Sequence, residues 1–425
     1  MRILVAGGGF AGLEVGRRLS RRLKRSEHEV TVVNAVNYLT YQPFLPEAAS
    51  GALEPRHVVV PLRQVLNRAR VVVGVIEHID HDAKRIQVRD AAGDPFELAY
   101  DVLVLTAGAV ARGPVDRALA ARALPFKKID DAMYLRNLVL ARLEAAAAEQ
   151  NDHRRRALLT FMFVGGGYTG VEALAELEDL ARAAVKRFYP ELRDFGMRWI
   201  VVEHAAGVIP ELGERMSNYV ERLLEKRGIE VRCHTKIDTG DADCVRLTDG
   251  EEVRTATLVW TTGVRACPVV ANSGFPVDEK GRVQTDEHLR VLDATGRPVP
   301  DVWAAGDAAA IPDVVTGKLC PPTAQYAVRQ ARRLARNVEA VIDGRESRPF
   351  EYRNRGLVVA LGQYRGAALV FGVQLRGFPA WIVARSYHLW AMPTLARKSR
   401  IAIDWAVALV FPRDITSLGG PPDDD

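Results

Sequence analysis

Cysteine is scarce in this chain, and the few cysteines stand far apart. The 425 residues contain four of them, Cys233, Cys244, Cys267 and Cys320. No two are separated by the two or four residues typical of a dithiol active site. We therefore expect neither a disulfide framework nor a catalytic cysteine pair, and no cysteine–histidine metal site.

The sequence also lacks any run of about 20 apolar residues, the length that spans a bilayer. Met1 and Arg2 lead directly into a strand-like run without a small-residue cleavage site, so we predict no signal peptide and expect a cytoplasmic protein. The 58 basic and 53 acidic residues nearly balance, with a net charge of +5, and arginine is spread along the chain. This distribution argues against nucleic acid as a partner.

Two segments repeat one pattern, an apolar strand followed by Gly-x-Gly-x-x-Gly and a helix. The helices are predicted over residues 13–24 and 171–187. In such a turn the first glycine permits a sharp bend, the second lets a pyrophosphate approach the helix N-terminus, and the third allows close helix–strand packing. One such turn is weak evidence, but two in the same context predict two dinucleotide sites. The glycines are Gly7, Gly9, Gly12, Gly165, Gly167 and Gly170.

Other elements follow from apolar runs and glycine turns. Strands are predicted over residues 30–33, 100–108, 198–203, 258–263 and 301–308. Two of these strands end in Thr-x-Gly, at Ala107-Gly108 and at Gly263, and the last runs into Gly306-Asp307. We also predict one surface helix over 141–156, short strands over 357–361 and 368–373, a helix over 392–411 and an acidic tail over 423–425.

In this order the motifs resemble those of the type II NADH dehydrogenases, which are single-subunit NADH:quinone oxidoreductases. The motifs that carry the resemblance are Gly7–Glu14, Tyr41-Gln42-Pro43, Gly165–Glu172, Gly306-Asp307 and the Ala-Gln-x-Ala-x-x-Gln helix at residues 324–330. The resemblance implies an α/β fold with two Rossmann-like dinucleotide-binding domains and a C-terminal membrane-docking region. It assigns residues 1–112 and 280–345 to FAD, 113–279 to NADH and 346–425 to the membrane.

The resemblance further implies that two electrons pass from NADH through FAD to a membrane quinone, without proton pumping. It places the protein peripherally on the cytoplasmic face of the cell membrane, with a homodimer as an option. Asn34 departs from the family pattern, since an acidic residue normally binds the adenosine ribose of FAD there, but an amide still hydrogen-bonds a hydroxyl. Ala331 replaces the final glycine of the quinone-site helix motif.

The resemblance also supplies the candidate site residues. Glu172 and Gln325 are the catalytic candidates, Glu172 for tuning hydride transfer or relaying protons, although it could simply complement the helix dipole. Asp307 would bind the ribityl chain of FAD or merely cap a helix. The cofactor-binding candidates are Gly7, Gly9, Gly12, Asn34, Gln42, Ala107, Gly108, Gly306, Asp307, Ala324, Gly165, Gly167, Gly170, Glu203 and Gly263.

Glu203 ends the second strand of the second repeat. An acid at that position accepts hydrogen bonds from a ribose 2′-hydroxyl and repels a 2′-phosphate, which predicts NADH rather than NADPH. Farther along, Pro321-Pro322 opens a helix whose N–H groups at residues 323–325 would stabilise reduced flavin, unless they only begin a packed helix. Cys320 could be a redox thiol near the flavin, but because it has no partner cysteine we expect a buried or idle thiol.

The C-terminal helix has an apolar face beside a basic cluster, Arg397, Lys398 and Arg400. This combination favours an anionic membrane surface, although a helix packed on the protein or on a second copy would look similar, and Asp404 interrupts the basic face. The predicted apolar face consists of Leu395, Ile401, Ala402, Trp405, Ala408 and Leu409.

The positions of the cysteines argue against other enzyme classes that share this fold. Disulfide reductases and sulfide:quinone oxidoreductases need flavin-side cysteines, and no cysteine precedes Cys233. Two alternatives remain open. One is a soluble NAD(P)H-dependent flavoprotein reductase of a protein carrier such as ferredoxin, and the other is a flavin-bound redox sensor that responds to NADH.

Overall fold

The computed structural model describes residues 1–24, 26–241, 243–354 and 356–417, so the predicted acidic tail lies outside the described residues. The chain divides into two compact units. The first unit consists of Met1–Thr40, Val60–Val110 and Val264–Arg353. The second consists of Tyr41–Val59, Ala111–Gly263 and Asn354–Asp425. These bounds differ from those of the FAD, NADH and membrane regions that the resemblance implies, and that division stays a prediction.

The first unit is built on a six-stranded sheet whose central strand is β1 (Arg2–Ala6). β1 is almost wholly buried, as expected of an uninterrupted apolar run in a parallel sheet. Helices α1 (Phe10–Arg22) and α11 (Ala324–Ile342) pack against each other. In spatial order the strands are β21 (Arg290–Leu292), β22 (Pro298–Ala304), β9 (Val102–Leu105), β1, β2 (Glu29–Asn34) and β5 (Arg70–Val73), with only β21 antiparallel to its neighbour.

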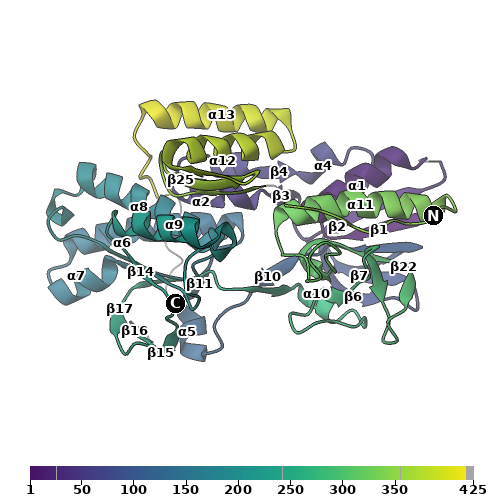
Figure 1. Ribbon diagram of the computed structural model, residues 1–425, viewed down its shortest axis with the longest axis horizontal. Helices are drawn as coiled ribbons and strands as arrows, with labels where there is room; N and C mark the ends of the chain where they lie inside the picture. The colour runs from purple at the N-terminus through teal and green to yellow at the C-terminus, as the bar shows by residue number, and fades with distance from the viewer. Residues whose placement is uncertain (25, 242, 355, 418–425) are drawn as a thin grey trace. The chain divides into compact units, whose positions relative to one another are not determined.

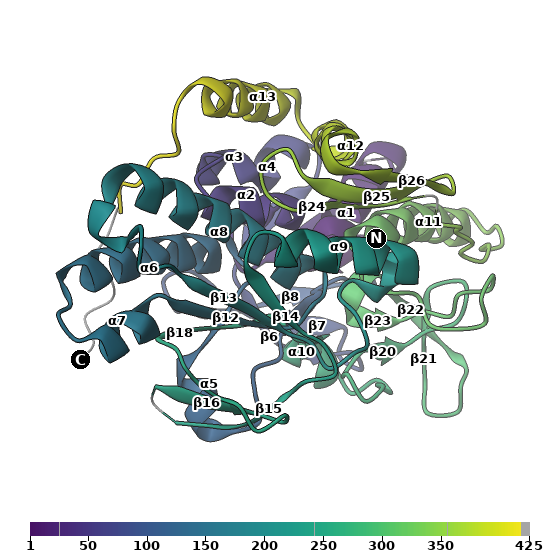
Figure 2. The same cartoon turned by 60° about the vertical axis from the view of Figure 1, so that its left-hand side comes forward.

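The second unit repeats this plan with a five-stranded parallel sheet (Figure 2). Its central strand, β12 (Thr160–Val164), is buried along its whole length and leads into α8 (Tyr168–Phe188). The strand order is β11 (Ala123–Pro125), β18 (Thr257–Trp260), β12, β13 (Arg198–Val202) and β14 (Ile229–Arg232).

The single surface helix predicted over 141–156 is wrong in two respects. The segment contains the end of α6 (Ile129–Ala148) and a separate α7 (Asp152–Leu158). Asn151 separates them, because its side-chain oxygen accepts the N–H groups of His153 and Arg154 at 2.9 and 3.1 Å and so begins a new helix. One face of α6 is also buried in the second unit rather than exposed.

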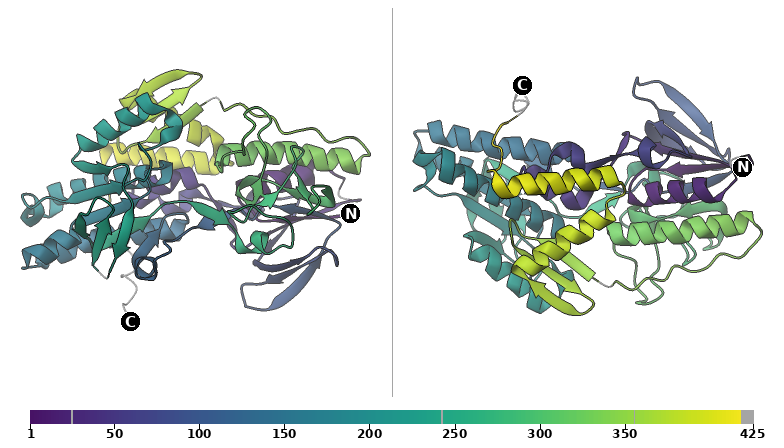
Figure 3. Two further views of the ribbon diagram at one scale, coloured as in Figure 1. Left: turned by 60° about the horizontal axis from the view of Figure 1, so that its bottom comes forward. Right: turned by 90° about the horizontal axis from the view of Figure 1, so that it is seen from above.

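The C-terminal region belongs to the second unit (Figure 1). It begins with an antiparallel sheet of β24 (Gly356–Ala360), β25 (Gly366–Val370) and β26 (Val373–Arg376). Helix α12 (Gly377–Ala391), which the sequence analysis missed, packs on this sheet. Helix α13 (Leu395–Val410) then packs on α12 and on the short α3 (Pro55–Val58), as Figure 3 shows from above.

Candidate functional site

The first glycine turn has the geometry that its sequence predicts. Gly7 has a φ of +110°, which an L side chain rarely adopts. A side-chain carbon added at Gly12 would lie 1.7 Å from the carbonyl oxygen of Gly7, so helix and strand approach as closely as glycine allows. A carbon added at Gly9 would meet nothing within 4 Å, which leaves open space at the start of α1.

The second glycine turn repeats these features. Gly165 has a φ of +113°, and a carbon added at Gly170 would lie 2.1 Å from the carbonyl oxygen of Gly165. Gly167 again faces open space. In both units a threonine directly after a neighbouring strand donates to the carbonyl of the first glycine, Thr106 at 2.9 Å and Thr261 at 3.2 Å. Two turns of one construction therefore leave space beside two helix N-termini, where a pyrophosphate fits.

In each unit a side chain at the end of a strand holds the turn itself, which the sequence analysis missed. Asn34 is the last residue of β2, and Glu203 directly follows β13. Asn34 Oδ1 accepts the N–H of Gly8 at 2.8 Å, and Glu203 Oε2 accepts the N–H of Gly166 at 2.5 Å. A carbon added at Gly8 or Gly166 would lie 3.1 or 3.0 Å from those side chains. The signal was the middle glycine of each Gly-Gly-Gly. Asn34 can thus replace an acid in this contact, since the N–H of Gly8 needs only a hydrogen-bond acceptor.

Glu203 is buried and densely bonded. Its Oε1 accepts the N–H of Ala205 at 2.8 Å and lies 2.7 Å from Nδ1 of His204. Only 8% of the residue is exposed. Each carboxylate oxygen has two acceptor positions, so one remains for a ribose hydroxyl.

The Gly-Asp turn is held by the helix that carries the predicted quinone motif. Gly306 has a φ of +73°, and its N–H donates to Oε1 of Gln330 at 2.9 Å. Gln330 is only 2% exposed, so the second glutamine of the motif has a structural task. Asp307 follows in the same short turn.

Ala324 and Gln325 begin α11, where Tyr352 Oη donates to Oε1 of Gln325 at 3.2 Å. The expectation that residues 323–325 all present N–H groups to flavin is wrong for Thr323. Its N–H donates to the carbonyl of Pro321 at 2.9 Å, because the two prolines bend the chain back on itself.

The remaining cofactor candidates lie in turns. Gly108, next to Ala107, and Gly263 both have a φ of +70°. In the first unit the carbonyl of Gly108 accepts the N–H of Cys267 at 3.0 Å. Gln42 lies in the second unit, unlike Asn34, and its amide is 3.4 Å from the carbonyl oxygen of Lys127.

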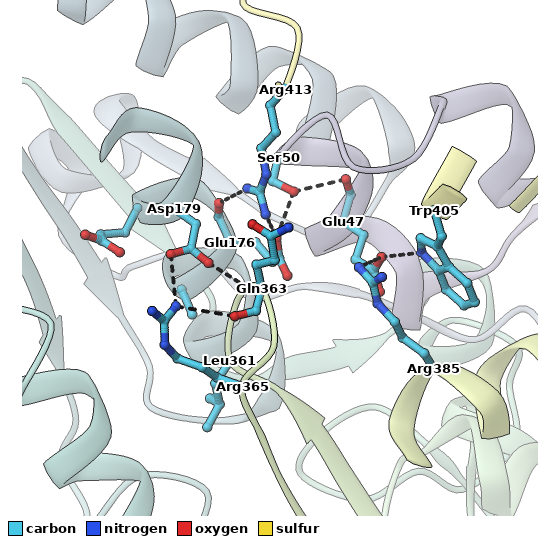
Figure 4. Close-up of polar contacts among 12 residues, drawn as sticks. Glu47, Ser50, Glu176, Asp179, Leu361, Gln363, Arg365, Arg385, Trp405 and Arg413 are labelled. Carbon is cyan, nitrogen blue, oxygen red and sulfur yellow. Dashed lines mark hydrogen bonds and ion pairs between the residues drawn. The ribbon is translucent and has the colours of Figure 1, made fainter. Parts of the chain in front are cut away.

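A cluster of buried charges lies in the second unit (Figure 4). Glu47, on α2 (Leu45–Ala49), is 4% exposed, and its Oε2 accepts from Arg385 at 2.8 Å and from the Trp405 indole at 2.7 Å. Glu176, on α8, is fully buried and is paired with Arg413 at 2.9 Å. The two arginines come from the C-terminal region, so these ion pairs attach that region to the rest of the unit.

Glu172 lies one helical turn before Glu176 on α8. Its Oε1 accepts the N–H of Ala360 at 2.9 Å. Burial, with a smaller contribution from the nearby Glu47 and Glu176, raises the pKa of Glu172 to about 8 in spite of that hydrogen bond, which lowers it. At neutral pH the side chain therefore holds a proton.

The raised pKa of Glu172 predicts a pH-dependent stability. Below about pH 4.5 the carboxyl is protonated in both states; between there and about pH 8 only the unfolded chain ionises, so the folded state loses stability as pH rises. Glu172→Gln should remove this loss, because glutamine does not ionise. The stability of the variant should therefore fall less between pH 5 and pH 8 than the stability of the parent. Melting temperatures at pH 5, 6.5 and 8 measure this, with the exposed Glu191→Gln as control. Parallel pH profiles for parent and Glu172→Gln would contradict the prediction.

The predicted apolar face of the C-terminal helix is right for Leu395, Ala402 and Leu409, which are exposed, but wrong for two other residues. Ile401 is fully buried, and Trp405 bonds Glu47, so neither belongs to an outer face. Asp404 accepts from His57 Nδ1 at 2.6 Å and so seats α13 on α3. The predicted apolar face is corrected accordingly. The exposed apolar side chains of α13 are Leu395, Ile403, Val407, Leu409 and Val410.

Two sheets, one parallel and one parallel except for its edge strand β21, each have a strand–glycine turn–helix unit with space for a pyrophosphate. They define a class of α/β protein that holds two dinucleotides. The chain belongs to the pyridine nucleotide-disulphide oxidoreductase family, whose sequence profile matches residues 1–331. In the described residues, no helix is long and apolar enough to cross a membrane.

Similar proteins match almost the whole chain. A type II NADH:quinone oxidoreductase of Mycobacterium tuberculosis is 28% identical over 97% of this chain and 89% of its own. One from Staphylococcus aureus is 28% identical over 88% of this chain and 91% of its own. The structure of NDH2 from Plasmodium falciparum in complex with NADH is 19% identical and has a TM-score of 0.90 over 98% of this chain and 99% of that one. The predicted fold class and resemblance are confirmed.

Proposed function

We propose that this protein is a type II NADH:quinone oxidoreductase, which passes two electrons from NADH through FAD to a quinone without pumping protons. One observation carries the proposal. The chain has two matching dinucleotide turns but no cysteine before Cys233, so it has no dithiol in its first half to accept electrons. Burial also raises the pKa of Cys320 to about 11, which suits an idle thiol. The electrons must leave to an external acceptor, and the relatives' names supply a quinone.

Bound FAD supplies the two-electron redox chemistry. In the first unit the backbone around Gly9 and the start of α1 bind its pyrophosphate, Asn34 its ribose and Asp307 its ribityl chain. In the second unit the backbone around Gly167 binds the pyrophosphate of NADH, and Glu203 orients its ribose. Glu172 holds a proton at neutral pH, which suits a group that supplies protons to a quinone.

The direct test is a pair of anaerobic half-reactions of the purified holoenzyme. NADH should bleach the flavin absorbance, and a water-soluble quinone should restore it at a rate that matches steady-state turnover. Rapid recovery with ferredoxin but not with quinone would support the soluble carrier reductase. Slow bleaching with no rapid acceptor at all would support the NADH-responsive sensor.

Gln325→Leu should slow reoxidation by quinone at least about tenfold and leave bleaching by NADH unchanged, since removing one hydrogen bond to a polar substrate costs about 1–2 kcal/mol. Rapid-mixing absorbance measures both steps. Tyr352→Phe is the matched control, because it removes the hydrogen bond to Gln325 and leaves the glutamine in place. Equal loss in both half-reactions would indicate a flavin-binding or folding role instead.

We also propose that α13 docks the protein on the cytoplasmic face of the cell membrane. Leu395, Ile403 and Val410 are 80%, 61% and 76% exposed, an unusual density of exposed apolar side chains on one helix. Arg400, near its start, is exposed too and suits an anionic surface. A homodimer through this face is the alternative, and the size of the protein in detergent-free solution would separate the two.

Glutamates on that face should release the protein from membranes. The triple variant Ile403→Glu, Val407→Glu, Val410→Glu should lower binding to anionic vesicles at least about tenfold. Each change replaces an apolar side chain that would enter the bilayer by a negative charge that the anionic lipids repel. Vesicle sedimentation measures this. The control Gln150→Glu, Arg154→Glu makes the same change in net charge near α7 and should bind normally. Unchanged sedimentation of the triple variant would contradict docking through α13.

Deleting residues 392–425 is a poorer test. Arg136 donates to the carbonyls of Asp414 and Thr416 at 2.7 Å, and Arg413 pairs with Glu176. Truncation would leave Arg136 and Glu176 buried without these partners, and the loss of stability would obscure any effect on the membrane.

A further inference from the structure

A groove of about 690 Å³ lies in the second unit, apart from both glycine turns. The second half of α8 forms one wall, and the end of α13 with the residues after it forms the other. The volume lies in the range of about 300–1000 Å³ that is typical of small-molecule sites. None of the predicted cofactor residues lines it.

One wall of this C-terminal groove is basic. Lys186 and Arg187 are exposed on the last turn of α8, and in the described part of the chain neither has a carboxylate within ion-pair distance. Arg187 lies over the ring of Phe188. The one carboxylate in the lining, Asp179, is already bound to Arg227 at 2.9 Å and to the N–H of Gln363 at 2.7 Å. The wall therefore presents positive charge that the protein itself does not balance.

Other positive groups of the lining are already occupied. Arg385 and Arg413 are paired with Glu47 and Glu176, and Arg182 is paired with Glu178. Arg365 forms an ion pair with Asp179 at 3.4 Å. Lys186 and Arg187 are thus the two cations left for an anion.

The opposite wall is apolar. Leu409 and Phe411 line it and are 58% and 63% exposed, and Phe188, at the end of α8 beside the basic residues, adds a third apolar side chain that is 44% exposed. A free phosphate would gain nothing from these groups. An anion that carries a hydrocarbon chain would use both walls, because burying apolar surface away from water is favourable.

We propose that the C-terminal groove binds an anionic glycerophospholipid. Its phosphate contacts Lys186 and Arg187, and one acyl chain lies along Leu409 and Phe411. A single bound lipid would then orient the end of α13 at the membrane surface. The inference rests only on the membrane-docking part of the proposed function and would hold whatever acceptor takes the electrons.

The test is native mass spectrometry of the detergent-solubilised holoenzyme, with phosphatidylglycerol and phosphatidylcholine of identical acyl chains. We expect one phosphatidylglycerol retained per chain and at least about tenfold weaker retention of phosphatidylcholine. Lys186→Glu with Arg187→Glu should lower phosphatidylglycerol retention about tenfold or more. The matched control is Arg154→Glu with Arg156→Glu on α7, where Arg156 also lies over a phenylalanine ring. It should retain the lipid.

A second variant tests the apolar wall without touching charge. Ala408→Trp fills the groove from α13 and should abolish retention while leaving the basic wall intact. Equal retention of the two lipids, or normal retention by either groove variant, overturns the proposal. If inorganic phosphate displaces bound phosphatidylglycerol as strongly as free lipid does, the proposed contact of an acyl chain with Leu409 and Phe411 is overturned. If the protein is a dimer without bound lipid, and Ala408→Trp dissociates that dimer, then a second copy of the chain occupies the groove and the lipid proposal is overturned. Vesicle sedimentation of the parent protein reports failure of the membrane-docking proposal separately, and NADH-dependent bleaching of the same samples reports failure of the electron-transfer proposal.

Discussion

NADPH is expected to reduce this protein at least about 100-fold less efficiently than NADH, measured as kcat/KM. Glu203 is the reason, because its carboxylate is buried beside the second glycine turn, where it accepts N–H groups from Gly166 and Ala205. A 2′-phosphate carries nearly two negative charges. At about 4 Å and an effective dielectric constant of about 20, repulsion between unit charges is about 4 kcal/mol, whereas 100-fold needs only about 2.7 kcal/mol.

Glu203→Gln separates charge from shape. The amide oxygen can still accept the N–H of Gly166, so the turn is preserved while the charge is lost. We expect discrimination between the two coenzymes to fall to about tenfold or less. Steady-state kinetics with a water-soluble quinone measure both values. Coenzyme efficiencies within about threefold of each other in the parent enzyme would exclude the role assigned to Glu203.

Arg385→Leu is expected to lower the free energy of unfolding by about 3–5 kcal/mol at neutral pH. The side chains of Arg385 and Glu47 are only 11% and 5% exposed, and the guanidinium lies 4.0 and 4.7 Å from the ring centres of Trp381 and Trp405. The variant leaves a buried carboxylate without its cation. Burial already raises the pKa of Glu47. Without Arg385 the carboxyl should become protonated more readily, so the loss should shrink as pH falls.

Urea unfolding measures the effect. The double variant Arg385→Leu, Glu47→Gln should recover part of the loss, because no buried charge is then left unpaired. Arg365→Leu is the matched control, since that arginine is 41% exposed and lies 3.4 Å from Asp179, an ion pair worth less than about 1 kcal/mol. A loss in Arg385→Leu no larger than in Arg365→Leu would show that the buried cluster does not hold the C-terminal region.

The buried charge cluster was not predictable from the sequence. Glu47, Glu176 and Arg413 each stand in charged or mixed segments that are typical of solvated surfaces. They become buried only because the C-terminal chain packs against α2 and α8. Arg413, for example, pairs with Glu176, which lies 237 residues earlier in the chain. The inward position of Trp405 has the same cause, since its indole meets a carboxylate 358 residues away. No local pattern records such a partner.

The sequence by itself determined the parts that depend on backbone geometry within a few residues. Gly7 and Gly165 need a positive φ, and Gly12 and Gly170 need the absence of a side chain, so the two dinucleotide turns could be located from spacing alone. Tertiary structure alone decided which charges are buried and which face of α13 is exposed. The physical reason is range, because a glycine acts through its own backbone, whereas an ion pair or a buried face exists only once distant segments have been brought into contact.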